Sequence, residues 1–182
     1  MSCQTAERSV RATGFLGLVL VLLGGCDSTV GPFDPDDPLI RTEEQGYELE
    51  LQGDEWLSTE IPYTFENRTG RTVHIPNCQG GISLRLDRLE GLDWESTWIP
   101  NLLLCISPPI VVDPGESFFD TLHVSGGLPG TRTGPRWDRE DPSGIYRIVW
   151  MGAFAGPGDP SGSLGPQLPL EHRVSNPFAL SR

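Results

Sequence analysis

The chain has 182 residues, with 25 acidic and 13 basic side chains, no lysine, and a net charge of −12 at pH 7. A strongly anionic surface repels phosphate backbones and anionic headgroups, so we expect neither nucleic acid nor an acidic lipid surface as a partner. Beyond that exclusion, the charge is expected to serve solubility. The 22 glycines and 17 prolines indicate many turns but fall short of a disordered composition.

An apolar run, Phe15–Leu23, lies near the start of the chain and follows Arg8 and Arg11. A basic segment, an apolar segment and then small residues form the pattern of a secretory signal peptide. A membrane-spanning helix needs about 20 apolar residues, and this run has nine. The alternative is a short buried helix of a cytosolic domain, but Gly24 and Gly25 would end such a helix abruptly.

The next residues, "LGGC" at 23–26, resemble the lipobox of bacterial lipoproteins. The resemblance implies that signal peptidase II cuts between Gly25 and Cys26, and that the Cys26 thiol carries a diacylglyceryl group. It also implies a cell-envelope location, with acyl chains on Cys26 as the contact with the membrane. Stable attachment needs two or three chains, at about 0.8 kcal/mol per buried methylene. Asp27 fits a signal for inner-membrane retention in some bacteria, but the choice of membrane stays open.

These features divide the chain into a signal peptide at 1–25, a lipidated cysteine and tether at 26–45, and a folded domain at 46–182. The tether is rich in proline and aspartate and shows no apolar periodicity. Its "DPDDP" at 34–38 could be read as a calcium loop. It lacks the ligand spacing and closing glutamate of an EF-hand, so a solvated acidic linker is favoured.

Four cysteines are present. Cys3 lies in the predicted signal peptide, and the lipobox resemblance implies that Cys26 carries lipid. Cys78 and Cys105 remain as a pair in an oxidising compartment, and we predict that they form a disulfide. Two reduced core cysteines are the alternative. A metal site is not expected, because neither cysteine has a histidine or a second cysteine close by in the sequence.

From Tyr47 onward the apolar residues alternate with polar ones, which is typical of half-buried antiparallel strands. Strands are predicted at 47–52, 61–67, 72–75, 82–86, 94–98, 118–124, 144–151 and in the tail 172–180. One shared face is expected in each of several groups: Tyr47, Leu49 and Leu51; Ile61, Tyr63 and Phe65; Val73 and Ile75; Ile82, Leu84 and Leu86; Trp94 and Trp98; Tyr146, Ile148 and Trp150.

Turn residues separate these strands. "NRTG" at 67–70 and "LEGLDW" at 89–94 are predicted to close hairpins, and Pro114-Gly115 suits the centre of a type II turn. No stretch after residue 30 has a helical period. About eight short strands in one block predict an all-β fold, a single antiparallel sandwich of two sheets.

Two connections, 126–144 and 152–171, are longer than compact domains usually contain. The first holds Trp137 between charged neighbours, which makes Arg136, Trp137, Asp138 and Arg139 a candidate recognition loop. The favoured alternative is that Trp137 pins the loop to the edge of the sandwich. Whether either loop binds anything stays open.

From "TFENRTGRTVHI" to "PFAL" the domain is similar to small immunoglobulin-like sandwiches of bacterial envelope lipoproteins. The order of turns also resembles the BsuPI-type proteinase-inhibitor domain, with Pro114-Gly115-Glu116 and Gly144-Ile145-Tyr146 at matching points. That resemblance implies the fold, because these motifs encode turns and core rather than chemistry. The cysteine pair is not part of the inhibitor pattern.

The sequence contains no convincing catalytic set. His74, His123 and His172 show no convergent spacing, and "SGSLG" at 161–165 lacks the first glycine of a nucleophile elbow. The five tryptophans could form a sugar platform but suit core packing better. We therefore expect no cofactor and no enzyme activity. The expectation is a lipid-anchored envelope module that binds an envelope protein or glycan or has a structural role. The alternative is a membrane-tethered inhibitor, and an envelope hydrolase comes last.

Overall fold

The computed structural model describes residues 37–53, 55–101, 104–132, 134–156 and 164–182. The predicted signal peptide at 1–25, with Gly25, lies outside the described residues, as do Cys26 and the first part of the predicted tether. The described strands are β1 (Ile40–Thr42), β2 (Gly46–Glu48), β3 (Glu50–Gln52), β4 (Trp56–Glu66), β5 (Val73–Cys78), β6 (Gly81–Ile82), β7 (Leu84–Glu90), β8 (Asp93–Trp98), β9 (Ser107–Val112), β10 (Ser117–Gly127), β11 (Gly144–Trp150), β12 (Phe154–Ala155) and β13 (Phe178–Ser181), with a 3-10 helix at Leu170–Arg173.

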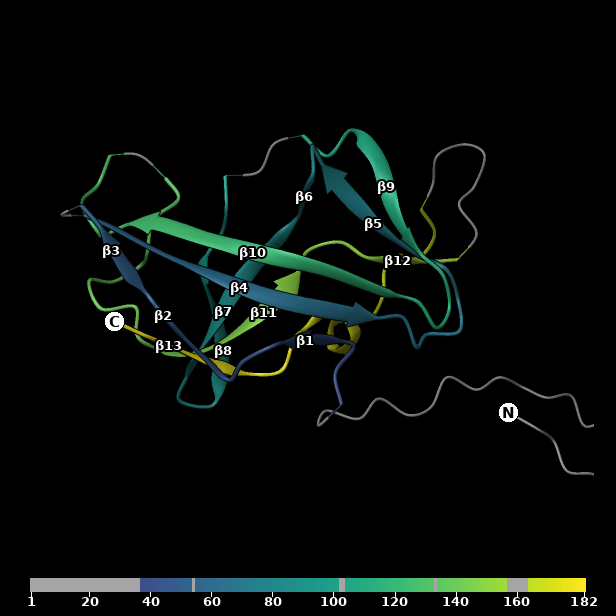
Figure 1. Cartoon of the computed structure of the whole chain (residues 1–182), viewed down its shortest axis with the longest axis horizontal. Coiled ribbons are helices and arrows are strands. Elements are labelled where there is room, and N and C mark those ends of the chain that lie inside the picture. The colour runs from purple at the N-terminus through teal and green to yellow at the C-terminus, as the bar shows by residue number, and fades with distance from the viewer. Residues whose placement is uncertain (1–36, 54, 102–103, 133, 157–163) are drawn as a thin grey trace, which may run out of the picture.

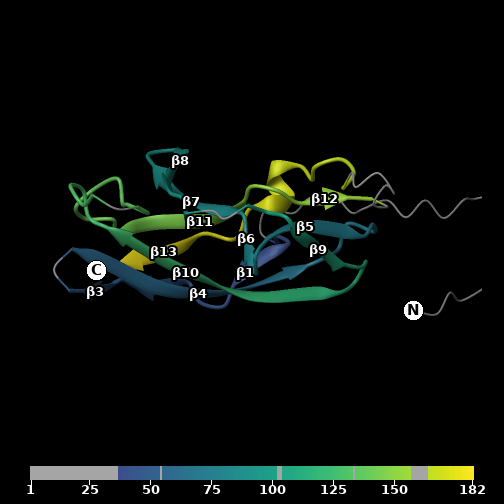
Figure 2. The same cartoon turned by 90° about the horizontal axis from the view of Figure 1, so that it is seen from above.

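The strands form two packed layers, so the predicted all-β antiparallel sandwich is confirmed (Figure 1 and Figure 2). In the first layer, β4 and β10 pair over eleven residues each, and β1 and β3 pair with the other edge of β4. The second layer has the order β2-β13-β11-β7-β8, in which only the β2–β13 pair is parallel among the described strands. A small third sheet of β12, β5, β6 and β9 lies at one end.

The core between the layers comes from the alternating strands. The predicted inward residues of β4 and β7, among them Ile61, Phe65 and Leu86, are fully buried. Trp150 lies at the centre, where its ring centroid is 4.8 Å from that of Phe65 and 6.3 Å from that of Tyr63. Burying each such side chain contributes about 1.5–3 kcal/mol, so this cluster is a main source of stability. No helix in the described part of the chain is both long and apolar enough to cross a membrane.

The turn at 67–70 is not the hairpin that the sequence predicts, because β4 and β5 belong to different sheets. The chain passes from the first layer to the third sheet there, and Asn67 makes the corner. Its amide group donates to the carbonyls of Arg71 and Val112, at 2.7 and 2.8 Å. The Pro114-Gly115 turn is confirmed, with φ +83° at Gly115, and it leads from β9 in the third sheet to β10 in the first layer. Two backbone hydrogen bonds join the corners: the N–H of Asn67 donates to the carbonyl of Glu116, and the N–H of Gly115 donates to the carbonyl of Asn67.

The stretch 47–52 is not one strand. Gly46–Glu48 pairs with β13 in the second layer, whereas Glu50–Gln52 pairs with β4 in the first. The chain crosses between layers at Leu49, which is buried, and Leu51 is exposed instead of sharing its face. β1 also lies within the stretch 26–45 and pairs with β4. In the tail, only Phe178–Ser181 forms a strand, and it follows the 3-10 helix.

A β-bulge in β8 overturns the prediction that Trp94 and Trp98 share a face. Leu86 pairs with Trp98 and Asp87 with Ser96, so β8 contains one extra residue, Thr97. The extra residue shifts the alternation by one. Trp98 therefore packs in the core, while Trp94 lies on the outer face of the second layer.

Candidate binding surfaces

The predicted disulfide between Cys78 and Cys105 is confirmed, and it joins the end of β5 to the segment before β9. Cys78 is buried and Cys105 is exposed. The same segment exposes two large apolar side chains, Leu104 and Ile106, each 75% exposed. The disulfide thus fixes an apolar, solvent-facing stretch to the body of the sandwich.

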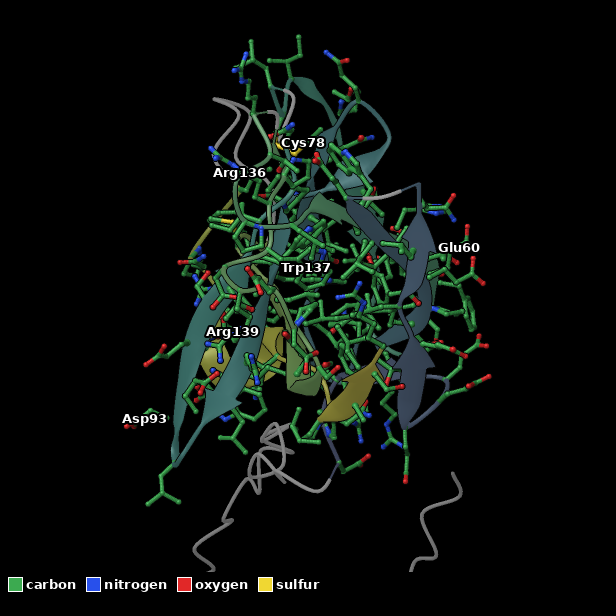
Figure 3. The ribbon with its side chains drawn as sticks, turned by 90° about the vertical axis from the view of Figure 1, so that its left-hand side faces the viewer. Glu60, Cys78, Asp93, Arg136, Trp137 and Arg139 are labelled. Carbon is green, nitrogen blue, oxygen red and sulfur yellow. A yellow bond between two sulfur atoms is a disulfide. The ribbon has the colours of Figure 1, made fainter. Side chains whose placement is uncertain are left out.

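In the loop 126–144, Trp137 is 2% exposed, so it is not the exposed anchor of a recognition loop. Its ring meets that of Tyr146 edge-on at 6.4 Å, and Figure 3 shows it among the packed side chains of the interior. The favoured alternative, a tryptophan that pins the loop, is the arrangement found. The side chains next to it have separate partners: Arg136 donates to the carbonyl of Thr131, and Arg139 forms an ion pair with Glu90 at 2.9 Å.

The three histidines do not converge. His74 Nε2 lies 2.9 Å from the carbonyl oxygen of Gly156, while His123 Nδ1 lies 3.2 Å from a carboxylate oxygen of Glu60 on the outer face of the first layer. His172 is in the 3-10 helix. Within the described residues, no three histidine, cysteine, aspartate or glutamate side chains are grouped so as to hold a metal ion.

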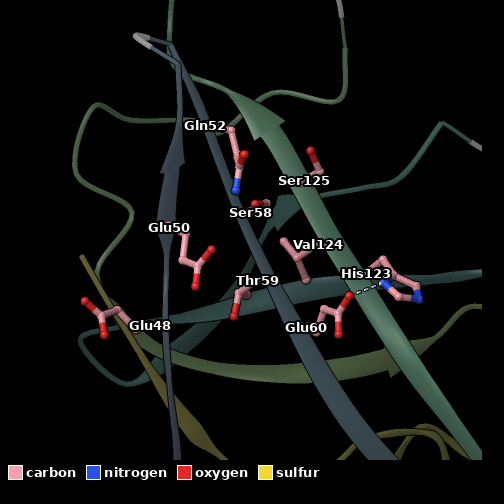
Figure 4. A pocket seen from close by; sticks show the side chains of 9 residues that line it. All are labelled: Glu48, Glu50, Gln52, Ser58, Thr59, Glu60, His123, Val124 and Ser125. Carbon is pink, nitrogen blue, oxygen red and sulfur yellow. Dashed lines mark ion pairs between the residues drawn. The ribbon is translucent and has the colours of Figure 1, made fainter.

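The outer face of the first layer carries a shallow acidic groove of about 400 Å³. Figure 4 shows Glu48 and Glu50 along one side and the Glu60–His123 ion pair along the other, with Ser58 and Thr59 between them. Glu60 and His123 are both about 70% exposed, so solvent screens their attraction strongly. This surface repels anions and has the charge to attract cationic groups.

The outer face of the second layer is built on a buried carboxylate, Asp87, whose side chain is 2% exposed. Arg85 Nε lies 2.6 Å from one of its oxygens, and Arg147 Nη2 lies 3.2 Å from the other. The Arg147 guanidinium also stacks over the Trp94 ring, 4.4 Å from its centre. A buried charge is stable only when it is paired, so Asp87 holds both arginines and, through Arg147, the tryptophan.

Beside this cluster is a second groove of about 390 Å³, which we call the Trp94 groove. Trp94 and Arg147 form one side, and the 3-10 helix and the chain after it form the other. Its lining is mostly apolar, with two charged side chains: Pro38, Trp94, Arg147, Leu170, Glu171, Val174, Ser175 and Pro177. An apolar groove with a few fixed polar groups is the usual form of a ligand site.

A third groove, of about 400 Å³, runs along β10 beside the disulfide. Asp120 faces inward here and accepts hydrogen bonds from the hydroxyl of Tyr63, at 3.1 Å, and from the backbone N–H of Thr121, at 2.8 Å. Burial, followed by the nearby Asp120 carboxylate, raises the pKa of Tyr63 well above its ordinary value. Tyr63 therefore stays a neutral donor to Asp120 at any physiological pH.

The sequence did not indicate the Trp94 groove or the groove at Asp120. The alternation Arg85-x-Asp87 on one strand was a visible sign of a charged outer face. The bulge in β8 hid the outward position of Trp94. Asp120 shares the inner face of β10 with Leu122 and Val124, and the strand was predicted from its apolar residues.

No family model matches the chain, and no curated protein matches it. One solved structure that resembles it is described as "X-ray structure of Northeast Structural Genomics Consortium target SoR45". The two share 15% sequence identity and a TM-score of 0.42, over 80% of this chain and 88% of that one. So distant a likeness carries no argument about function.

Proposed function

We propose that this chain is a lipid-anchored protein of the bacterial cell envelope, whose immunoglobulin-like sandwich binds a partner without catalysis. The observation that carries the proposal is the combination of the "LGGC" sequence at 23–26 with the Cys78–Cys105 disulfide. The first is the signature of lipidation, and the second belongs to an oxidising compartment outside the cytosol. Two independent features therefore favour the same location.

One local contact supports the immunoglobulin-like assignment. The hydroxyl of Tyr146, near the start of β11, donates to the carbonyl of Pro142 four residues earlier. A tyrosine at the start of a strand that hydrogen-bonds to the backbone just upstream is the "tyrosine corner" of immunoglobulin-like sandwiches. The same contact orders the end of the long loop before β11.

The anchor is tested by intact-mass analysis of the protein purified from membranes, with and without reductant. We expect a chain that begins at Cys26 and carries acyl groups, and that gains about two mass units on reduction, for the two hydrogens added to the disulfide. The Cys26→Ala variant should lose the acyl mass and enter the aqueous phase of a detergent extraction. A native chain that begins at Met1 and partitions into water would refute the anchor.

The Trp94 groove is the surface that best fits a binding role. It combines an aromatic ring, a guanidinium held in place by Asp87, and an apolar wall, which together suit an envelope protein or a glycan. We expect affinity capture from envelope extracts to recover a partner that the Trp94→Ala variant loses. The Leu51→Ala variant removes an exposed apolar side chain elsewhere and serves as the control. Equal capture by both variants would place the partner on another surface.

A second candidate function, a membrane-tethered proteinase inhibitor, is favoured by the exposed segment at the disulfide. Leu104 and Ile106 project into solvent on either side of Cys105, which is fixed to β5. A protease could accept such an apolar side chain in its specificity pocket. Incubation of the protein with a panel of serine proteases tests this function, and unchanged cleavage rates for every protease would remove it.

A further inference from the structure

β10 is the open edge of the first layer. It pairs with β4 from Ser117↔Glu66 to Gly127↔Trp56, and no other described strand pairs with it, apart from an isolated bridge between Gly127 and Arg136. The end of β10 is covered, because Trp98 Nε1 donates to the carbonyl of Ser125 and Trp137 lies close to Gly126. No other described strand therefore covers the stretch 117–124, which is an open strand edge within the described part of the chain.

This edge is not protected as edges usually are. Proteins protect long edge strands with lysine, proline or bulges. Among the described strands, β9 pairs only with β5, and it contains Pro108 and Pro109 and has an irregular register. β10 has neither proline nor lysine, and its register with β4 is regular over all eleven residues. Its one protective feature is the inward charge of Asp120.

A groove accompanies the open edge. Residues 120–123 of β10 form one wall, and residues 78–82, Leu84, Pro100 and Asn101 form the other. The buried side chains of Ile82, Leu84 and Leu122 line its apolar part, beside the Cys78–Cys105 disulfide. A strand edge next to such a groove offers what an added peptide strand uses: backbone groups to pair with, and space for alternate side chains.

Asp120 determines what kind of strand fits. Its carboxylate faces the groove and holds the backbone N–H of Thr121, which an added strand would need as a donor. A basic side chain brought next to Asp120 would pair with the carboxylate and release that N–H. An acidic side chain would meet a like charge in a half-buried site, and the net charge of −12 would repel it before contact.

We propose that the open edge of β10 binds an extended, positively charged peptide segment by strand addition, with a lysine or arginine side chain beside Asp120. This inference deepens the binding role proposed above, but it does not depend on the lipid anchor or on the Trp94 groove. It assigns the partner chemistry: an unstructured or terminal protein segment that alternates apolar and polar residues around a basic one.

The probe is a fluorescent nine-residue peptide of alternating threonine and valine with a central lysine, added to the full chain in detergent. We expect saturable binding by anisotropy, with slowed hydrogen exchange at the amides of 117–124. A peptide with a central glutamate should bind at least about tenfold more weakly. So should a lysine peptide that is N-methylated at alternate amides, because it cannot pair with the strand.

Two matched variants complete the test. Asp120→Asn should reduce the affinity for the lysine peptide about tenfold. It should also reduce the ratio of the affinities for the lysine and glutamate peptides. Glu60→Gln removes the same charge from the outer face of β4, and it should leave the affinity within about twofold, since Glu60 is well exposed and screened.

Three results would overturn the inference: no protection at 117–124, equal binding of the N-methylated peptide, or equal effects of the two variants. The last two would show that the acidic surface attracts any cationic peptide without strand pairing. None of these results would contradict the capture of a partner through Trp94. Conversely, a lack of acyl groups would refute the proposed anchor but not strand addition, so the failures of the two proposals can be told apart.

Discussion

The contribution of the Cys78–Cys105 disulfide to stability can be worked out from its place in the chain. Its sequence separation of 27 closes a loop of 28 residues, counting both cysteines. The chain-entropy relation gives about 12 cal/mol/K for a loop of that size, or about 3.6 kcal/mol at 25 °C. A typical urea dependence of about 2 kcal/mol per molar then predicts that losing the bond lowers the unfolding midpoint by about 2 M.

The assay is urea unfolding followed by tryptophan fluorescence, in the oxidised and the fully reduced protein. The double variant Cys78→Ala with Cys105→Ala should reproduce the reduced midpoint, and alanine suits the buried Cys78 position because it introduces no buried polar group. Reductant should leave the double variant unchanged. If oxidised and reduced wild-type proteins unfold within about 0.2 M of each other, the loop-entropy reasoning is wrong for this fold.

Four further predictions concern the packed and charged residues. Replacing buried Asp87 by alanine should lower the free energy of unfolding by about 3–5 kcal/mol, because Arg85 and Arg147 lose their shared partner. In the same denaturation assay, the control Glu95→Ala on the exposed part of β8 should lower it by less than about 0.5 kcal/mol. Trp137→Ala should cost about 3–5 kcal/mol and speed proteolysis of the loop 126–144, and a cost below about 1 kcal/mol would contradict its burial. Burial raises the pKa of Tyr146 to about 12, above the ordinary value near 10. The tyrosine therefore loses its proton first in the unfolded state, and the free energy of unfolding should fall as pH rises from about 10 to 12. Tyr146→Phe should flatten the plot of unfolding free energy against pH in that range. Deleting Thr97 should leave the protein folded with its tryptophan emission unchanged, and an unfolded product would refute the bulge.

The core and the turns could be predicted from the sequence where a single local pattern determines the structure. Strict alternation placed Ile61, Phe65 and Leu86 inside correctly, and the glycine at the third position fixed the turn at Pro114-Gly115. Alternation says nothing about which sheet a strand joins. The corner at Asn67 and the crossing at Leu49 were therefore missed, because each depends on contacts between residues far apart in the chain.

The candidate surfaces were harder to predict for a related reason. The outward position of Trp94 depends on the bulge in β8, which local periodicity does not show. Alternation along β10 does place Asp120 on the inner face with Leu122 and Val124, but the groove beside it depends on which strands are its neighbours. Trp137 was conspicuous in sequence because charged residues surround it, yet it packs against Tyr146. Charged neighbours in the sequence do not decide whether an aromatic side chain faces solvent or the core. The proposed lipidation signal differs, because signal peptidases recognise linear motifs and no fold is needed to interpret such a motif.

The bulge at Thr97 has a consequence for sequence comparison. Because Thr97 is the supernumerary residue of β8, a homologue could omit it and still direct its two tryptophans to opposite sides of the sheet. An alignment that forbids a single gap there would match outer positions with inner ones along half the strand. It would then report substitutions of surface residues by core residues that never took place.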